Sequence, residues 1–187
     1  MIGYAFCGSF CTLARSIAVM KTLLDEGYEI QPIFSHHAAT LDTRFGTAAS
    51  FLETVSELCG RRPILTVAEA EPLGPKLPLE ALVIAPCTGN TLAKLALGVT
   101  DTAVTMAAKA HLRQSRPLLL APASNDAMAA NLKNVAALLE KKAVYFVPMK
   151  QDDPAQKPHS LVAEFSLIPD CLKAAIRGEQ RRPLFLV

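Results

Sequence analysis

Four short polar segments follow apolar runs in this sequence, and their residue types are those that bind phosphate. The segments are CGSF (7–10), SHHAAT (35–40), PCTGNT (86–91) and PASNDAM (122–128). Backbone N–H groups at the start of a helix, together with serine and threonine hydroxyls, bind phosphate without a strong local positive charge. The four segments therefore predict a site for an anionic ligand that forms many hydrogen bonds and carries a flat ring.

The sequence lacks the common nucleotide-binding fingerprints. Gly3 and Gly8 are too far apart for a G-x-G-x-x-G motif, and the next glycine is Gly27. The same two glycines have the spacing of a P-loop, but Ser9 stands where its lysine is needed. A dinucleotide or a triphosphate is therefore disfavoured. Helix capping alone is the alternative for each segment, because Ser, Thr and Asn also cap helix N-termini.

Apolar runs that alternate with helical patterns must position these segments. We expect strands over 1–7, 28–35, 63–67, 80–86, 116–123 and 143–148, and helices over 12–26, 47–59, 90–97, 101–114, 126–142 and 160–177. Residues 71–78 are expected to form a surface loop, because Pro and Gly interrupt them.

This alternation is typical of βαβ units. It predicts an α/β fold, a single Rossmann-like (flavodoxin-like) doubly wound parallel sheet flanked by helices. We expect one domain over 1–187, with a flap at 150–160 and a C-terminal tail at 179–187. Ligands of such sheets bind beyond the carboxyl ends of the strands, where the four polar segments fall.

The composition excludes several classes of protein. A net charge of +2 and the absence of Trp give no case for nucleic-acid binding. The apolar start lacks the basic residues of a signal peptide, and no apolar run reaches the roughly 18 residues of a membrane helix. Five cysteines without disulfide-domain spacing favour free thiols in a reducing cytoplasm and no metal site. An apolar content of 51% favours a homo-oligomer.

The stretch APCTGNTLAKLALGVTDTAVT (85–105) resembles the signature P-A-S-A-N-T-x-A-K-x-A-x-G-x-x-D of the flavoprotein family, which contains flavin-dependent decarboxylases and flavin prenyltransferases. The segment APASNDAM (121–128) is similar to that family's P-A-M-N-x-x-M, with Ser124 in place of Met. Cys87, Thr88 and Gly89 depart from the first signature. The resemblance covers about residues 1–148.

The resemblance implies FMN as cofactor. It places the phosphate near Gly8, Ser9, Ser35 and Thr88, and the isoalloxazine ring against the 86–91 and 122–126 turns. The remaining cofactor contacts implied by it are Pro86, Asn90, Thr91, Ala123 and Ser124. The amides of Asn90 and Asn125 can donate and accept, as the pyrimidine edge of a flavin requires.

Two departures separate the chain from the family's cysteine decarboxylases. The segment ILTVAEAEPLG lacks their histidine, and the flap lacks their cysteine. The stretches YAFCGSFCT and QDDPAQKPHSLVA instead resemble the flavoprotein-like subunits of bacterial dipicolinate synthase. That resemblance implies oxidation of a dihydro- or hydroxytetrahydrodipicolinate to pyridine-2,6-dicarboxylate during sporulation. It also implies the mother-cell cytoplasm, a second synthase subunit that binds NAD(P), and trimers or dodecamers.

A dicarboxylate requires cations or N–H donors. The candidates are His36, His37, Arg44, Lys150, Lys157 and His159. We assign Asn125, His36 and His37 to catalysis and Arg44 and Lys150 to the substrate, although a capped turn and a solvated loop are the structural alternatives. Two other functions stay open: another flavin-dependent decarboxylase or prenyltransferase, and a non-catalytic partner subunit that has lost flavin.

Overall fold

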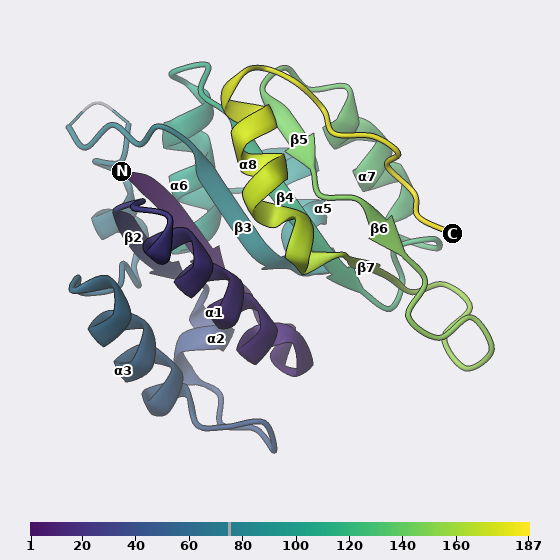
Figure 1. The fold of residues 1–187 in the computed structure, drawn as a ribbon, viewed down its shortest axis with the longest axis horizontal. Helices are drawn as coiled ribbons and strands as arrows, with labels where there is room; N and C mark the ends of the chain where they lie inside the picture. Colours follow the sequence, from purple (N-terminus) through teal and green to yellow (C-terminus); the bar gives the residue numbers. More distant parts are fainter. Residues whose placement is uncertain (75) are drawn as a thin grey trace.

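The computed structural model describes residues 1–74 and 76–187; Pro75, inside the expected 71–78 loop, lies outside the described residues. Its centre is a parallel sheet in the order β2-β1-β3-β4-β5 (Figure 1). These strands are β1 (Ile2–Phe6), β2 (Ile30–Phe34), β3 (Leu82–Cys87), β4 (Leu118–Ser124) and β5 (Val144–Phe146). The order reverses between β1 and β3, as in a flavodoxin-like fold, and confirms the predicted fold class.

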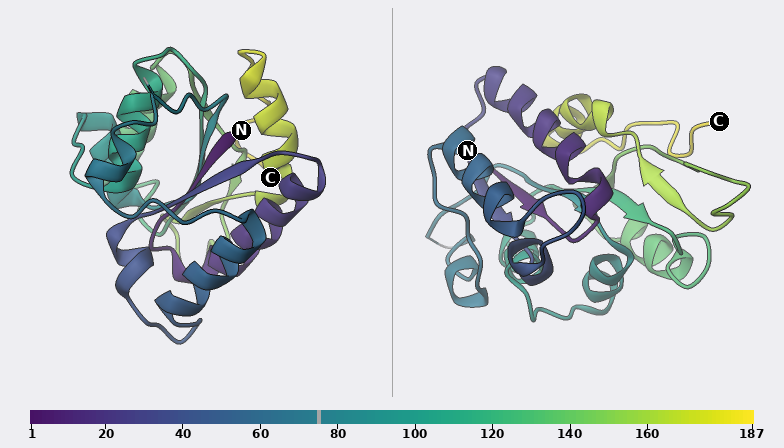
Figure 2. Two further views of the ribbon diagram at one scale, coloured as in Figure 1. Left: turned by 90° about the vertical axis from the view of Figure 1, so that its left-hand side faces the viewer. Right: turned by 90° about the horizontal axis from the view of Figure 1, so that it is seen from below.

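Helices cover both faces of this sheet, which explains why its strands are apolar throughout. Every residue of β1 and β3 is buried, as expected for strands of a doubly covered parallel sheet. One face carries α1 (Phe10–Asp25), α3 (Ala48–Cys59) and α8 (Ile168–Ile176). The other carries α4 (Val67–Ala70), α5 (Gly89–Leu97), α6 (Ala103–Leu112) and α7 (Leu132–Leu139) (Figure 2).

A buried hydrogen-bond chain ties α1 to the middle of the sheet. The Tyr4 hydroxyl lies 3.0 Å from the Ser16 hydroxyl, and Ser16 donates to the carbonyl of Ala85 at 2.5 Å. Tyr4 also packs against Phe6, and Phe6 stacks on Phe34. The core under the carboxyl ends of the strands is therefore fixed by packing and by hydrogen bonds together.

Two short antiparallel strands extend the sheet beyond the predicted parallel strands. β7 (Leu161–Ala163) pairs with the end of β4 at Ala123 and Ser124, and β6 (Met149–Lys150) pairs with β7. Residues 151–160 form the loop between β6 and β7, which projects from one end of the molecule (Figure 1). The C-terminal tail continues this sheet through a bridge between Met149 and Phe185.

Four predicted elements differ from the structure, and the first two are a strand and a loop. Residues 63–67 are not a strand, since only Ile64 bridges to Ile33 and α4 begins after Thr66. Thr66 and Glu69 form a reciprocal capping box, which starts a helix where a strand was expected. The expected surface loop at 71–78 is partly buried, because Leu73 is inaccessible to solvent.

The other two wrong elements are long helices. The helix expected at 126–142 is confined to α7, because residues 126–131 form turns. The helix expected at 160–177 is divided into β7, a 3₁₀ turn (Phe165–Leu167) and α8. Pro169 stands in the first turn of α8, where its missing N–H costs no hydrogen bond. A short helix, α2 (His36–Thr40), was not predicted.

Candidate functional site

Two adjoining cavities lie at the carboxyl ends of β1, β2, β3 and β4. Their volumes are about 710 and 890 Å³, and they share Gly8, Phe10, Thr88 and Asn90 as wall residues. The first extends toward α2, and the second toward the start of α1 and the loop between β6 and β7. The space is therefore bounded by the four polar segments that the sequence analysis singled out.

The structure places most predicted site residues in these walls. Ser35, His36, His37 and Thr91 line the first cavity, and the second is lined by Ser9, Arg44, Ala123, Ser124 and Asn125. Pro86 and Lys150 line neither cavity. Pro86 is buried inside β3, and Lys150 on β6 forms an ion pair with Glu164 at 2.6 Å.

Helix capping accounts for two of the hydroxyls but not for a third. Ser35 accepts the N–H of Ala38 at 3.4 Å, and Thr88 accepts that of Thr91 at 3.3 Å. Ser9 precedes α1, and in the described ranges 1–74 and 76–187 its side chain forms no cap hydrogen bond. The Ser9 hydroxyl at the N-terminus of a 16-residue helix is therefore available to a ligand.

Buried thiols lie directly behind this wall. Thr91 donates from Oγ1 to Sγ of Cys7 at 3.3 Å. Burial raises the pKa of Cys7 to about 11, although the Thr91 hydrogen bond opposes the shift. Burial also raises the pKa of Cys87 well above its ordinary value, and nearby Cys7 adds to it. Both thiols are protonated at neutral pH and are therefore poor nucleophiles and poor metal ligands.

Two described residues in the wall of the first cavity, Lys94 and Asp101, form an ion pair. Lys94 Nζ lies 2.9 and 2.8 Å from the two carboxylate oxygens of Asp101. The hydrogen bond from Lys94 lowers the pKa of Asp101. His36 and His37 are exposed beside this cavity, with ring centroids 5.9 Å apart.

The second cavity has cationic groups on its rim. Arg15, Arg44 and Lys157 line it. Lys157 pairs with Asp152 at 2.9 Å, and the pKa of Asp152 is lowered by hydrogen bonds from Ser160 and Lys157. The guanidinium of Arg44 lies 4.8 Å above the ring of Phe45. An anionic substrate could be bound from this rim.

A polar cluster fixes the floor of the second cavity. Ser124 Oγ donates to Asp126 Oδ1 at 2.5 Å, and Asn131 Nδ2 lies 3.0 and 2.9 Å from the two Asp126 oxygens. Asn134 donates to Asn131 Oδ1 at 2.8 Å. We refer to Ser124, Asp126, Asn131 and Asn134 as the Asp126 cluster.

The Asp126 cluster packs against the first residue of α5. A Cβ atom on Gly89 would lie 2.5 Å from Asn131 Nδ2, 2.6 Å from Ser124 Oγ and 2.7 Å from Asp126 Oδ1. These distances are too short for any larger side chain. Gly89, a departure from the flavoprotein signature, is therefore the residue that makes room for the cluster.

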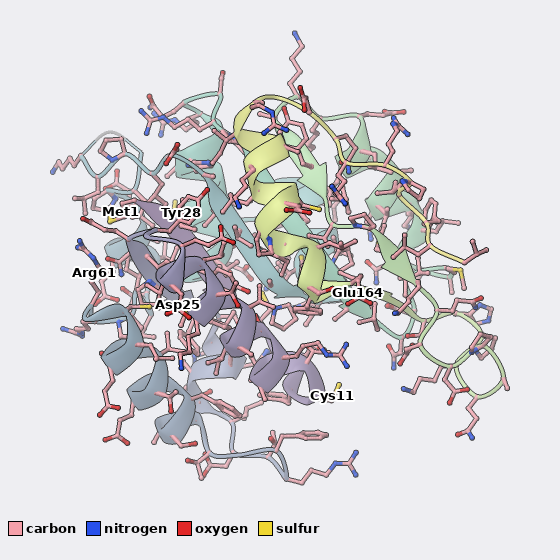
Figure 3. All side chains as sticks on the ribbon, viewed as in Figure 1. Met1, Cys11, Asp25, Tyr28, Arg61 and Glu164 are labelled. Carbon is pink, nitrogen blue, oxygen red and sulfur yellow. The ribbon has the colours of Figure 1, made fainter. Side chains whose placement is uncertain are left out.

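Sequence reasoning missed several residues of the second cavity. They are Phe10, Cys11, Arg15, Phe45, Asp126 and Asp152. Cys11 lies at the exposed start of α1 (Figure 3), and Arg15 follows four residues later on the same helix face. That spacing could have identified Arg15. Asp126 lies inside the predicted polar segment. It was not assigned to the site, because a helix was expected to begin at residue 126.

The walls fit the phosphate and ring of FMN. Hydroxyls, Asn amides and an uncapped helix start are the groups that bind a phosphate and the polar edge of a flavin. Among the described residues, no group of three or more His, Cys, Asp or Glu side chains is arranged to hold a metal ion. None of the described helices combines the length and apolar character needed to span a membrane.

Comparisons with known proteins agree with this geometry. Residues 1–176 match the flavoprotein family. The chain is 40% identical over 185 residues to the B subunit of dipicolinate synthase from Bacillus subtilis (strain 168), and the match covers 99% of this chain and 92% of the relative.

Solved structures show the same fold. The crystal structure of the corresponding dipicolinate synthase B subunit from Bacillus halodurans C superimposes with a TM-score of 0.91 at 36% identity, covering 100% of this chain and 95% of that one. The FMN-dependent cysteine decarboxylase SpaF shares the fold alone, with a TM-score of 0.66 at 22% identity and 95% of each chain covered. With a family match along nearly its whole length and a relative at 40% identity, this chain belongs to the flavoprotein family.

Proposed function

We propose that the chain is the flavin-containing subunit of a dipicolinate synthase, an oxidoreductase subunit that takes part in forming pyridine-2,6-dicarboxylate. The observation that carries this proposal is the 40% identity to the B subunit of the Bacillus subtilis synthase over nearly the whole chain. The amide and hydroxyl walls of the two cavities support it, because they fit an FMN molecule. Bound FMN would supply a two-electron acceptor.

In this proposal the chain's own residues bind and orient the cofactor. Gly8, Ser9, Ser35 and Thr88 would hold the phosphate, because they surround the start of α1 and the junction of the two cavities. The ring would lie against Asn90, Thr91, Ala123, Ser124 and Asn125. Pro86 would contribute only by shaping the backbone at the end of β3, since its side chain is absent from the described walls of both cavities.

The dicarboxylate substrate would bind at the cationic rim of the second cavity. Arg44 and Arg15 are exposed there, and neither forms an ion pair among the described residues. Lys150 is directed to Glu164 instead, so Arg15 replaces it in our assignment. His36 and His37 line the first cavity, where they could transfer protons at its exposed mouth.

The proposal also includes a second subunit and an oligomeric state. A second dipicolinate synthase subunit would bind NAD(P), because this chain has no dinucleotide fingerprint. A homo-oligomer, a trimer or a dodecamer, would bury the exposed apolar side chains. The expected location is the mother-cell cytoplasm of a spore-forming bacterium.

A thermal-shift titration with FMN tests the cofactor. Saturating FMN should stabilise the chain by several kcal/mol, following RT ln(1 + [L]/Kd). Asn90→Ala should lower FMN affinity while retaining the fold, because it removes a polar group from the wall and no core volume. Ser9→Asp should abolish binding by charge repulsion at the phosphate position. Unchanged FMN binding by Ser9→Asp would refute that position.

The second candidate function is a structural partner subunit without flavin. The residues that favour it are Cys87 and Gly89, which depart from the flavoprotein signature, and Ser35 and Thr88, whose hydroxyls already cap α2 and α5. In that case FMN gives no thermal shift, and Asn90→Ala leaves the α5 cap intact, because Thr88 forms that cap. A colourless protein that FMN does not stabilise would decide for this candidate.

A further inference from the structure

Asp126 differs from the other carboxylates of the two cavities. Asp101 pairs with Lys94, and Asp152 pairs with Lys157. No lysine, arginine or histidine among residues 1–74 and 76–187 lies within ion-pair distance of Asp126. Its hydrogen bonds come from two neutral groups, the Ser124 hydroxyl and the Asn131 amide. Within the described part of the chain, Asp126 is therefore a carboxylate held by neutral groups, without a cationic partner.

The charge lies at the N-terminus of α5. Gly89 is the first residue of that helix, and the position of a Cβ on it would be 2.7 Å from Asp126 Oδ1. The first turn of α5 contains no acidic residue of its own. The positive end of the helix dipole is stabilised by a nearby anion, and here the turn after β4 supplies that anion. Thr88 accepts the N–H of Thr91 in the same turn.

A helix start with a carboxylate beside it repels a second anion. The start of α1 is different, because neither a side-chain cap nor an acidic residue in the first turn is present there. Both helix starts face the same space, through Gly8 and Ser9 on one side and Gly89 and Asn90 on the other. The two ends of the space are therefore electrostatically unequal.

We propose that Asp126 is a specificity-determining residue, which excludes anionic groups from the part of the second cavity beside Gly89 and directs the anionic group of a ligand to the start of α1, where Thr88 reaches it from the junction of the two cavities. Ser124, Asn131 and Asn134 are positioning residues that hold its carboxylate against Gly89. The proposal deepens the proposed function, since it rests on a phosphate-bearing ligand and sets its orientation. The ligand class is a molecule with one anionic end and one neutral, hydrogen-bonding ring.

The test uses inorganic phosphate as the probe and needs no flavin. Phosphate is titrated at constant ionic strength into the full chain, the Ser9→Asp variant and the Ser9→Asp/Asp126→Asn double variant, and melting temperature and binding heat are recorded. Ser9→Asp should remove phosphate binding at α1. The double variant should regain it at α5, with an affinity on the order of tenfold above that of Ser9→Asp.

Two matched variants separate charge from structure. Ser9→Asp/Ser124→Ala retains the carboxylate and should not regain phosphate binding, whereas Ser9→Asp/Glu57→Gln removes one exposed charge on α3 and should behave like Ser9→Asp. If Asn at 126 prevents folding, Asp126→Ser, whose hydroxyl can still accept from Asn131, replaces it and should give the same gain. A folded double variant that binds phosphate no better than Ser9→Asp overturns the proposal.

The failure of this inference is distinguishable from failure of the proposed function. If the unaltered chain does not bind FMN but the double variant still regains phosphate, the cofactor assignment is wrong and Asp126 still excludes anions. If FMN binds and the double variant does not regain phosphate, the cofactor assignment stands and the role of Asp126 is refuted.

Discussion

Cys7 follows β1 at the carboxyl edge of the sheet, and its thiol is held in the protonated form. Burial raises its pKa from 9.0 to about 11. The unfolded chain loses this proton at lower pH than the folded chain, so the folded state binds more protons between the two values. A raised pKa of an acid therefore means that stability is retained below pH 9 and lost as the pH rises toward 11.

We predict that the free energy of unfolding falls between pH 9 and pH 11. A fully buried thiol with this shift contributes roughly 2–3 kcal/mol to the decrease. Urea denaturation at a series of pH values measures it. Cys7→Ala should make the free energy of unfolding depend less steeply on pH in this range. Cys11→Ser should leave that dependence unchanged, because Cys11 is exposed at the start of α1. Equal slopes in the unaltered chain and in Cys7→Ala would contradict the assignment.

At the residue scale, sequence reasoning identified most of the cavity walls but not their charges. Thr88, Asn90 and Asn125 follow strands that are apolar and short, and this local pattern was sufficient to place them. Asp126 was not identified, because its surroundings include Asn131, five residues away, and Gly89 in a different segment. The pairing of Lys150 with Glu164 was not predicted, because the two residues come into range only through the antiparallel pairing of β6 and β7.

At the scale of elements, α5 is stabilised at both ends. Its N-terminus is capped by Thr88 and faces Asp126, and its C-terminus ends at Gly98 in the left-handed conformation, with φ +77°. Lys141 from the end of α7 donates to the carbonyls of Leu95 and Ala96 at 2.9 and 3.2 Å. A cation at the last turn stabilises both the free carbonyls and the helix dipole.

We predict that Lys141→Met lowers the free energy of unfolding by on the order of 1 kcal/mol, because two charge-assisted hydrogen bonds to the last turn of α5 are lost. Thermal and urea denaturation measure the change. Lys142→Met is the matched control, since Lys142 is exposed and forms no side-chain hydrogen bond among the described residues. A similar loss in both variants would show that Lys141 acts only through general charge.

Helices and strands were predicted correctly where the local residue pattern determines the conformation. The prediction failed where contacts with residues distant in the sequence determine it. Runs such as IGYAF and LVIAPC are strands because both faces are buried, and their apolar composition shows this. The segment 126–131 is apolar enough for a helix. Its backbone turns because Ala129 and Asn131 both donate to the carbonyl of Asp126. Residues 161–163 form a strand because they pair with the end of β4. Their local sequence does not indicate this pairing.

At the scale of the whole molecule, large apolar side chains remain exposed on one end of α5. Leu97 is 77% exposed and Val99 is 41% exposed. Exposed apolar side chains that are close together are typical of surfaces that meet another protein. This arrangement is compatible with the homo-oligomer in our proposal.

We predict that the purified chain sediments as an oligomer. Leu97→Arg should lower the mass of the sedimenting assembly, because burying a guanidinium in an apolar contact between subunits has a large desolvation cost. Analytical ultracentrifugation of both proteins measures this. Leu58→Arg on α3, on the other face of the sheet, serves as the control and should keep the mass. Loss of mass in the control but not in Leu97→Arg would place the interface on the α3 face.

The bridge between the tail and β6 has a practical consequence for handling the protein. Met149 exchanges backbone hydrogen bonds with Leu184 and Leu186, each at 2.8 Å, so the last residues cover the outer edge of the sheet. An uncovered strand edge is a template for pairing with other chains. Truncation before residue 183 would leave that edge open to strand donation from a neighbouring molecule, and preparations of the shortened protein would be prone to aggregate.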